Sequence, residues 1–285
     1  MVINHNLNAV HAERSLGLAV GNVSKDQEKL SSGIRINRAG DDAADLSVSE
    51  KMRSLVRGLN RASANAMDNI SFIQTSEGYL QETTDVLHRL RELAIQSANG
   101  IYTQSDRTMI QVEVSQLIDE IDRIASHAQF NGLNMLTGRF SNGEWGNATA
   151  SMWFHIGANM DQSERVYVST MTSAGLGLRA LGETTGIQIT TTDDANRAIN
   201  TISKSLEVVS KQRADLGAYQ NRLEFAMRGL DSGSENLAAA ESRIRDADMA
   251  SEMVNFVKDQ ILTQSGTSMV AQANVSHQSV LNLMR

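Results

Sequence analysis

The residues best suited to chemistry lie between positions 36 and 53, in the segment INRAGDDAADLSVSEKMR. Asp41 and Asp42 follow a glycine, Asp45 comes three residues later, and basic side chains lie on both sides. These basic residues are Arg35, Arg38, Lys51 and Arg53. Adjacent carboxylates can hold a divalent cation, and Gly-Asp-Asp is a run that some metal-dependent polymerases use. A metal-dependent enzyme is therefore one hypothesis for this chain.

The same acidic residues also suit the beginning of a helix. Asp is a preferred N-cap residue because its carboxylate accepts hydrogen bonds from the unpaired N–H groups of the first turn. Carboxylates in that turn also interact favourably with the helix dipole. A divalent cation would need further oxygen ligands, and the sequence shows no second acidic cluster. We therefore predict that Asp41, Asp42 and Asp45 cap a helix, and we predict no catalytic residue, no metal site and no cofactor.

Other candidates for catalysis are weaker. The six histidines are scattered and none follows the His-Glu-x-x-His spacing of a zinc protease. The chain has no cysteine, which excludes thiolate metal sites and cysteine nucleophiles. Asp246 and Asp248, within residues 245–249, are predicted to mark a helix break or a solvated face. We do not expect an enzyme.

The composition favours long helices. The chain has 285 residues and no proline, where average usage would give roughly 14. A proline inside a helix costs about 3 kcal/mol, so its absence suits long uninterrupted helices. The net charge of −7 and the pI of about 5.4 argue against a nucleic-acid surface and a polybasic membrane patch. No run approaches the ~18 apolar residues of a membrane span, and the first residues do not resemble a Sec-type signal peptide.

Apolar residues recur in alternating steps of three and four, which predicts helices that pack lengthwise. One such repeat predicts a helix over residues 43–98, roughly 80 Å long at 1.5 Å per residue. Others predict a helix over residues 110–128 and another over residues 195–230. In the first segment the expected seam contains Leu16, Val20, Val23, Gln27, Leu30 and Ile34.

The helical period is lost between residues 129 and 192. Residues 151–156 and 165–171 are rich in β-branched and aromatic side chains and flank a turn-forming octet, so they predict a β-hairpin. Residues 186–192 predict a further short strand. The fold class is therefore mainly α, a long antiparallel helical rod (a coiled-coil-like bundle) from both chain ends, with a small β-hairpin insert. We expect the insert at the distal end of the rod.

The two ends of the chain are helical in pattern but poor in large apolar residues. Isolated helices of this kind are marginal in water. Segments that bury too little apolar surface on their own can become ordered when a partner supplies the missing burial. Residues 1–36 and 250–285 therefore predict assembly with each other or with further copies of the chain.

Several segments along the chain resemble those of bacterial flagellins. They include LSSGIRINRAGDDAADLSVSEKMR (30–53), ISFIQTSEGYLQETTDVLHRLRELAIQSANG (70–100), EVSQLIDEIDRIASHAQFNGLNMLTG (113–138), ESRIRDADMASEM (241–253) and ILTQSGTSMVAQAN (261–274). The stretch from Ser151 to Ser173 is most similar to the short core flagellins of spirochaetes, whose filaments lie in the periplasm.

This resemblance implies a structural subunit that self-polymerises into the flagellar filament used for motility. It implies an N-terminal inner-core helix over 1–40, rod helices over 41–128, a β-hairpin insert over 129–192, a rod helix over 193–249 and a C-terminal inner-core helix over 250–285. The implied subunit-interface residues are Leu30, Arg35, Ile36, Asp41, Asp42, Arg53, Arg245, Asp246, Val280, Leu281 and Met284.

The resemblance also implies partners and a location. The partners are further copies of the chain, an export chaperone at the C-terminal tail, hook-associated and cap proteins, and sheath proteins, with no nucleic acid and no membrane span. The implied location is the bacterial flagellum, reached through the flagellar type III route, and it is periplasmic in a spirochaete and otherwise extracellular. Arg89, Leu93 and Glu113 lie where the family presents a surface to the vertebrate Toll-like flagellin receptor.

Two other classes of protein remain open from the sequence. One is a secreted helical adaptor or coiled-coil protein that forms a small oligomer. The other is the metal-dependent enzyme built on Asp41 and Asp42.

Overall fold

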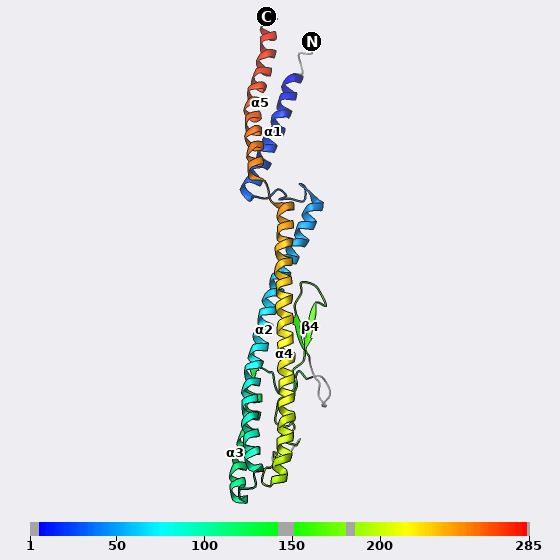
Figure 1. Ribbon diagram of the computed structural model, residues 1–285. Coiled ribbons are helices and arrows are strands. Elements are labelled where there is room, and N and C mark those ends of the chain that lie inside the picture. The colour runs from blue at the N-terminus through cyan, green and yellow to red at the C-terminus, as the bar shows by residue number, and fades with distance from the viewer. Residues whose placement is uncertain (1–5, 142–150, 181–185, 284–285) are drawn as a thin grey trace. The chain divides into compact units, whose positions relative to one another are not determined.

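The computed structural model describes residues 6–141, 151–180 and 186–283, with side chains as far as residue 276. Within these residues the chain forms long helices and two small antiparallel hairpins (Figure 1). The helices are α1 (Leu7–Ser32), α2 (Ala43–Ala98), α3 (Gln104–His127), α4 (Thr192–Arg245) and α5 (Met249–Leu283). Met1–Val56 and Glu235–Arg285 form one compact unit, called here the terminal unit, and Arg57–Ser234 form a second, called the central unit.

The central unit is built on the antiparallel pairing of α2 and α4 (Figure 1). Ser63 Oγ of α2 donates a hydrogen bond of 2.9 Å to Asp231 Oδ1 of α4, and further along the pair Arg213 forms an ion pair with Glu77. Apolar side chains from both helices bury together between these polar contacts. The predicted helix over residues 43–98 is confirmed, and its predicted seam supplies buried core residues that include Ile73, Leu80, Leu87, Leu90 and Ala94.

Helix α3 packs back against this pair. It begins with a capping box, in which Thr103 Oγ1 accepts from the Asp106 N–H and the Asp106 carboxylate accepts from the Thr103 N–H. Its predicted apolar seam is confirmed in part, because Val114 and Ile121 are buried in the same core, whereas Leu117, which was also expected there, is only partly buried and Ile118 is fully buried.

A tight hairpin that the sequence analysis did not predict follows α3. Strands β1 (Gln129–Phe130) and β2 (Leu133–Asn134) are joined by Asn131 and Gly132, both with positive φ. Positive φ at both central residues defines a turn for which Asn-Gly is the preferred sequence. The signal for this hairpin was therefore present in the sequence.

The predicted β-hairpin is confirmed, but its second strand lies earlier than expected. Strand β3 (Met152–His155) pairs with β4 (Ser163–Val166), so β4 begins inside the predicted turn and ends soon after Arg165. Beyond β4 the backbone no longer pairs with β3 and forms hydrogen bonds with other parts of the chain. Gln212 of α4 accepts from the Ser169 N–H and donates to the Tyr167 carbonyl.

The predicted strand over residues 186–192 does not form in the described residues. Gly186 makes a single bridge with Arg179. After it, the amide side chain of Gln111 donates to the Ile187 carbonyl at 3.1 Å and accepts from the Ile189 N–H at 2.7 Å. A side chain of α3 thus satisfies the backbone groups that a neighbouring strand would otherwise pair.

The insert does not lie at the distal end of the helices, and that expectation was wrong. The turn between β3 and β4 lies against Gly58 and Asn65 of α2, whereas α2 ends 33 or more residues later, at Ala98. The reason is the direction of α3, which runs back along α2. The hairpin continues in that direction and covers α2 beyond the end of α3. The chain then returns toward the C-terminal end of α2, where the Ile189 carbonyl accepts a hydrogen bond from Ser97.

The close approach at Gly58 generates a prediction with a matched control. A Cβ at Gly58 would lie 2.8 Å from Cβ of Ala158, whereas at Gly78 of the same helix nothing lies within 4 Å. Replacing an open helical glycine with alanine stabilises by about 0.5–1 kcal/mol. We expect Gly78→Ala to raise the free energy of unfolding by that amount and Gly58→Ala to lower it, as measured by chemical denaturation. Equal gains in the two variants would contradict this packing of the hairpin turn.

Candidate assembly surface

A short backbone ladder joins the two ends of the chain in the terminal unit. Helix α1 ends at Gly33, which adopts the left-handed conformation and donates its N–H to the Lys29 carbonyl. The Arg35 N–H then donates to the Arg245 carbonyl at 2.7 Å, and the Ala247 N–H donates to the Gly33 carbonyl at 3.0 Å. Residues 33–35 and 245–247 therefore pair as two short antiparallel segments, which we call the joint.

Arg35 completes the joint with its side chain. Its guanidinium donates to the Ile244 carbonyl at 2.7 Å and to Asp45 Oδ2 at 3.0 Å. The last carbonyls of a helix have no partner within the helix and carry a partial negative charge, so a cation there is favourable. Ile36, only 1% exposed, lies buried beside it. Arg35 thus fixes the end of α4 to the beginning of α2.

The acidic cluster divides into separate structural roles. Asp42 Oδ1 accepts from the N–H groups of Ala44 and Asp45, both at 3.0 Å, so Asp42 caps α2 as predicted. Asp45 does not cap α2, contrary to the prediction, because its carboxylate pairs with Arg35 within the first turn.

Asp41 does not cap α2, and that part of the prediction was wrong. Asp41 Oδ2 accepts from the N–H groups of Asn37 and Arg38, which closes the loop before the helix. These hydrogen bonds, that of Arg38 first, lower the pKa of the Asp41 carboxyl below its ordinary value. The reason is position, since Asp41 precedes the N-cap and its carboxylate turns back toward the loop.

The predicted helix break at residues 245–249 is confirmed. Helix α4 ends at Arg245 and α5 begins at Met249. Asp248 is the cap of α5, because its Oδ1 accepts from the Ala250 N–H at 3.0 Å and from the Ser251 N–H at 3.3 Å. Asp246 accepts from the Ser242 hydroxyl.

The other predicted basic interface residues are engaged within the chain. Arg53 lies 3.6 Å from Glu241, Arg245 lies 2.6 Å from Glu50, and Arg38 lies 2.9 Å from Glu28. These ion pairs hold the beginning of α2 and the end of α4 together and attach α1 to the loop that follows it.

Beyond the joint, α1 and α5 run antiparallel along each other (Figure 1). Lys29 Nζ lies 2.6 Å from Glu252 Oε1 near the joint, and Asn6 donates to the Ala273 carbonyl near the other end. The side chains that face one another between these points are of three kinds: small, large apolar and charged. From α1 they are Ala9, Ala12, Leu16, Ala19, Val23, Asp26 and Leu30, and from α5 they are Glu252, Phe256, Asp259, Thr263, Gly266, Val270 and Ala273.

The predicted seam of α1 is correct at Leu16, Val23 and Leu30 and wrong at two positions. Val20 and Gln27 are exposed, and the residues before them, Ala19 and Asp26, are buried instead. At both positions the close approach of α5 favours the smaller side chain. A Cβ added at Gly266 of α5 would lie 3.2 Å from Cδ1 of Leu16 on α1. Leu30 lies in the seam, half-buried, as part of this pair.

Most large apolar side chains of the terminal helices point away from the seam. In the described residues, 12 of the 22 exposed large apolar side chains are on α1 and α5. They are Leu7, Val10, Leu18, Val20, Met249, Met253, Val254, Val257, Ile261, Leu262, Met269 and Val275. A groove of about 520 Å³ runs between the two helices, with Leu18, Leu262 and Met269 on its walls. Together these 12 side chains form what we call the outer apolar face.

Three predicted interface residues lie beyond the part of the chain whose side chains are described. Val280 and Leu281 belong to α5, and their side chains are outside the described residues. Met284 lies outside the described residues altogether.

The predicted receptor surface is partly buried. Arg89 Nη2 lies 2.8 Å from Glu113 Oε1, and a second hydrogen bond links Arg89 to Glu92. These contacts raise the pKa of Arg89 above its ordinary value, with Glu113 as the main cause. Leu93 is 2% exposed and belongs to the core of the central unit. The accessible part of this surface is therefore the ion pair.

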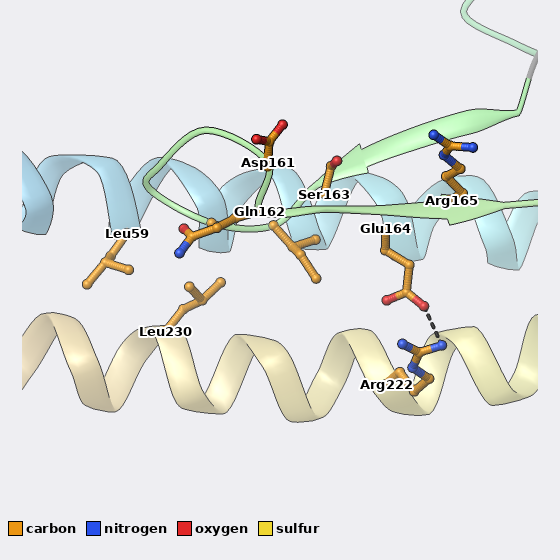
Figure 2. A pocket seen from close by; sticks show the side chains of 10 residues that line it. Leu59, Asp161, Gln162, Ser163, Glu164, Arg165, Arg222 and Leu230 are labelled. Carbon is orange, nitrogen blue, oxygen red and sulfur yellow. Dashed lines mark ion pairs between the residues drawn. The ribbon is translucent and has the colours of Figure 1, made fainter.

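A second concavity, of about 700 Å³, lies between the β3–β4 hairpin and the α2–α4 pair. Figure 2 shows Leu59 and Leu230 on its apolar side and Glu164 directed at Arg222. Glu164 and Arg222 form an ion pair, and Arg165 stacks on Trp153, 4.1 Å from the ring centroid. The Glu164–Arg222 ion pair thus attaches the hairpin to α4.

The architecture defines the chain as a helical structural protein with an incompletely buried pair of terminal helices. Among the described residues, no helix has the length and apolar character needed to cross a membrane. A family model of the bacterial flagellin N-terminal helical region matches residues 3–141, and one of the bacterial flagellin C-terminal helical region matches residues 199–284. The chain belongs to the bacterial flagellin family, and it is a structural filament subunit.

The relatives agree with this membership. The chain is 63% identical over 286 residues to the flagellar filament 33 kDa core protein of Treponema phagedenis, and 62% identical over 286 residues to the flagellar filament 31.3 kDa core protein of Treponema maltophilum. Both comparisons cover 100% of each chain. The resemblance to spirochaete core flagellins is thereby confirmed.

A solved structure shares the fold. The putative flagellar hook-associated protein from Vibrio parahaemolyticus matches with a TM-score of 0.57 at 14% sequence identity, over 72% of this chain and 100% of that one. At this identity the likeness concerns the fold alone.

The separate roles of Asp41 and Asp42 can be tested by amide hydrogen exchange. We expect Asp42→Ala to speed exchange at Ala44 and Asp45 and to destabilise the start of α2 by about 1 kcal/mol, the usual cost of losing an N-cap. Asp42→Asn should preserve protection because Asn is an equally good cap. Asp41→Ala should instead speed exchange at Asn37 and Arg38. The same set of amides responding to both alanine variants would contradict this division.

Proposed function

We propose that the outer apolar face of α1 and α5 is the surface through which copies of the chain polymerise into the filament. The observation that carries this proposal is that 12 large apolar side chains of α1 and α5 are exposed, whereas alanine, glycine and charged residues occupy many positions of the seam between the two helices. A soluble helix pair would ordinarily bury its large apolar residues between its own helices.

The magnitudes favour assembly. Full burial of a Val, Leu, Ile or Met side chain contributes about 1.5–3 kcal/mol. Association costs about 4–15 kcal/mol in lost translational and rotational freedom. Burial of the outer apolar face by neighbouring copies would exceed that cost, whereas the seam buries only part of the large apolar side chains of the isolated pair.

The joint has a corresponding role in this proposal. It connects the polymerising helices to α2 and α4 through backbone hydrogen bonds and the Arg35 and Arg245 ion pairs. The predicted interface residues Arg35, Ile36, Asp42 and Arg53 therefore act by shaping the subunit that is assembled.

The partners and the location extend the same proposal. The chain would leave the cell interior through the flagellar type III route with a chaperone on its C-terminal tail, and hook-associated, cap and sheath proteins would contact the filament. The similarity to core proteins of Treponema supports a periplasmic flagellum. The exposed Arg89–Glu113 pair is the part of the central unit that the Toll-like receptor would contact.

Removal of residues 250–285 tests the polymerising role of the ends. We expect the truncated chain to keep the folded central unit, because that unit has its own core, and to lose polymerisation completely. Circular dichroism would report the fold, and sedimentation of seeded protein would report the polymer. Filaments formed by the truncated chain would refute the proposal. A fixed dimer or trimer of the full chain would instead favour the small helical adaptor.

A single charge on the outer apolar face provides a sharper test. Ile261 is 61% exposed on α5, and Ile261→Asp should reduce polymerisation at least tenfold because burying an unpaired carboxylate costs several kcal/mol. Gln264→Glu, at an exposed polar position one turn away, adds the same charge and is the control. Both variants should keep the helicity of the central unit. Equal loss in both variants would show that charge alone, rather than the apolar surface, governs assembly.

A further inference from the structure

The seam between α1 and α5 contains one buried carboxylate. Asp26 is 8% exposed, and its Oδ2 has no hydrogen-bond partner in the part of the chain that the structure describes. Its neighbours along the same face of α1 are Val23 and Leu30. A buried acceptor without a partner is unfavourable, and more so when it is charged.

Charges of both signs surround Asp26. They are Lys29 on α1 and Glu252, Lys258 and Asp259 on α5. Lys29 lies 2.6 Å from Glu252 and is therefore engaged with that carboxylate. Burial first, and then the charges of Glu252 and Asp259, raise the pKa of Asp26 above its ordinary value, and the smaller opposing effects of Lys29 and Lys258 do not cancel this rise.

Glu252 has the opposite environment. Its carboxylate accepts hydrogen bonds from Lys29 and from Asn255, and these lower the pKa of Glu252 below its ordinary value. Within one seam, two carboxylates therefore respond to acid in opposite directions.

The signs follow from linkage. A carboxyl with a raised pKa binds its proton more tightly in the paired helices, so pairing becomes more stable as pH falls through that pKa. A carboxyl with a lowered pKa loses its contribution as pH falls further, through its own lower value. Pairing of α1 with α5 should therefore strengthen on mild acidification and weaken again in stronger acid.

We propose that Asp26 is a proton-sensitive element of the terminal helix pair, such that protonation of its buried carboxyl strengthens the pairing of α1 with α5. The element acts on the helices that carry the outer apolar face, so it also sets the pH dependence of assembly. That second consequence rests on the proposed function, whereas the pairing itself is a property of the helices.

The test compares Asp26→Asn and Asp26→Ala with Glu13→Gln, which removes one negative charge from an exposed position of α1. Two measurements are made on the full chain between about pH 7 and pH 4, where an Asp with a raised pKa titrates. One is amide exchange within α1, and the other is the concentration of subunit left unpolymerised after sedimentation.

For the wild type and Glu13→Gln, we expect protection of α1 to increase, and unpolymerised subunit to fall, on mild acidification. In Asp26→Ala the response should disappear, and at pH 7 the unpolymerised subunit should be about fivefold lower, the smallest factor expected from removing an unpaired buried acceptor. In Asp26→Asn the pH response should also disappear, whatever its absolute stability.

Two results would overturn the proposal. One is an unchanged pH response in both Asp26 variants. The other is more unpolymerised subunit at pH 7 in both variants, which would show that a neighbouring copy supplies a donor to Asp26. If no variant polymerises, the proposed function fails, and amide exchange in α1 still decides the proposal. Amides of α1 that remain unprotected in all variants at every pH would also overturn it.

Discussion

The burial of apolar surface is the constraint on which the terminal unit depends, because α1 and α5 cannot satisfy it alone. Alanine, glycine and charged residues occupy many positions of the seam between them. Most of the large apolar residues of the two helices are left on the outside. A helix pair of this kind gains more from neighbours than from its own partner, so its stability and its assembly are one property rather than two.

The central unit, in contrast, buries its apolar core without a neighbouring copy. Its large apolar residues are buried together, and polar side chains inside it are satisfied by the backbone of the irregular segment. Ser97 donates to the Ile189 carbonyl and Ser205 donates to the Leu176 carbonyl, while Gln111 and Gln212 each contact two backbone groups. This unit needs no neighbour for its core, and it can therefore remain folded while the terminal helices change their surroundings.

The sequence allowed prediction of those features that depend on local pattern. The bounds of α2, its seam and part of the seam of α3 follow directly from the apolar period, and the helix break before α5 follows from its acidic residues. The end of β4 and the absence of a strand after Gly186 depend on Gln212 and Gln111, which are distant in sequence. The backbone groups that these two glutamines bind are brought to them by tertiary contacts, which cannot be predicted from a local sequence pattern. The seam of α1 was misplaced at two positions for a related reason, since Ala19 and Asp26 are selected by how closely α5 approaches.

The joint shows the same limit. Its three-residue segments, 33–35 and 245–247, carry little strand character in the sequence, and their pairing exists only because both ends of the chain arrive at one place. The acidic residues that suggested a cation site instead cap helices and close a loop at the joint. Asp42 caps α2 and Asp248 caps α5, the two helices that begin there.

The absence of proline from these helices has a consequence for the rate of folding. A chain with prolines waits tens of seconds or longer for X-Pro bonds to isomerise, and a chain with cysteines can be delayed by wrong disulfides. This chain contains neither residue. Helix formation and the docking of long helices take far less time than either step. Folding of this chain is therefore free of both of these slow steps.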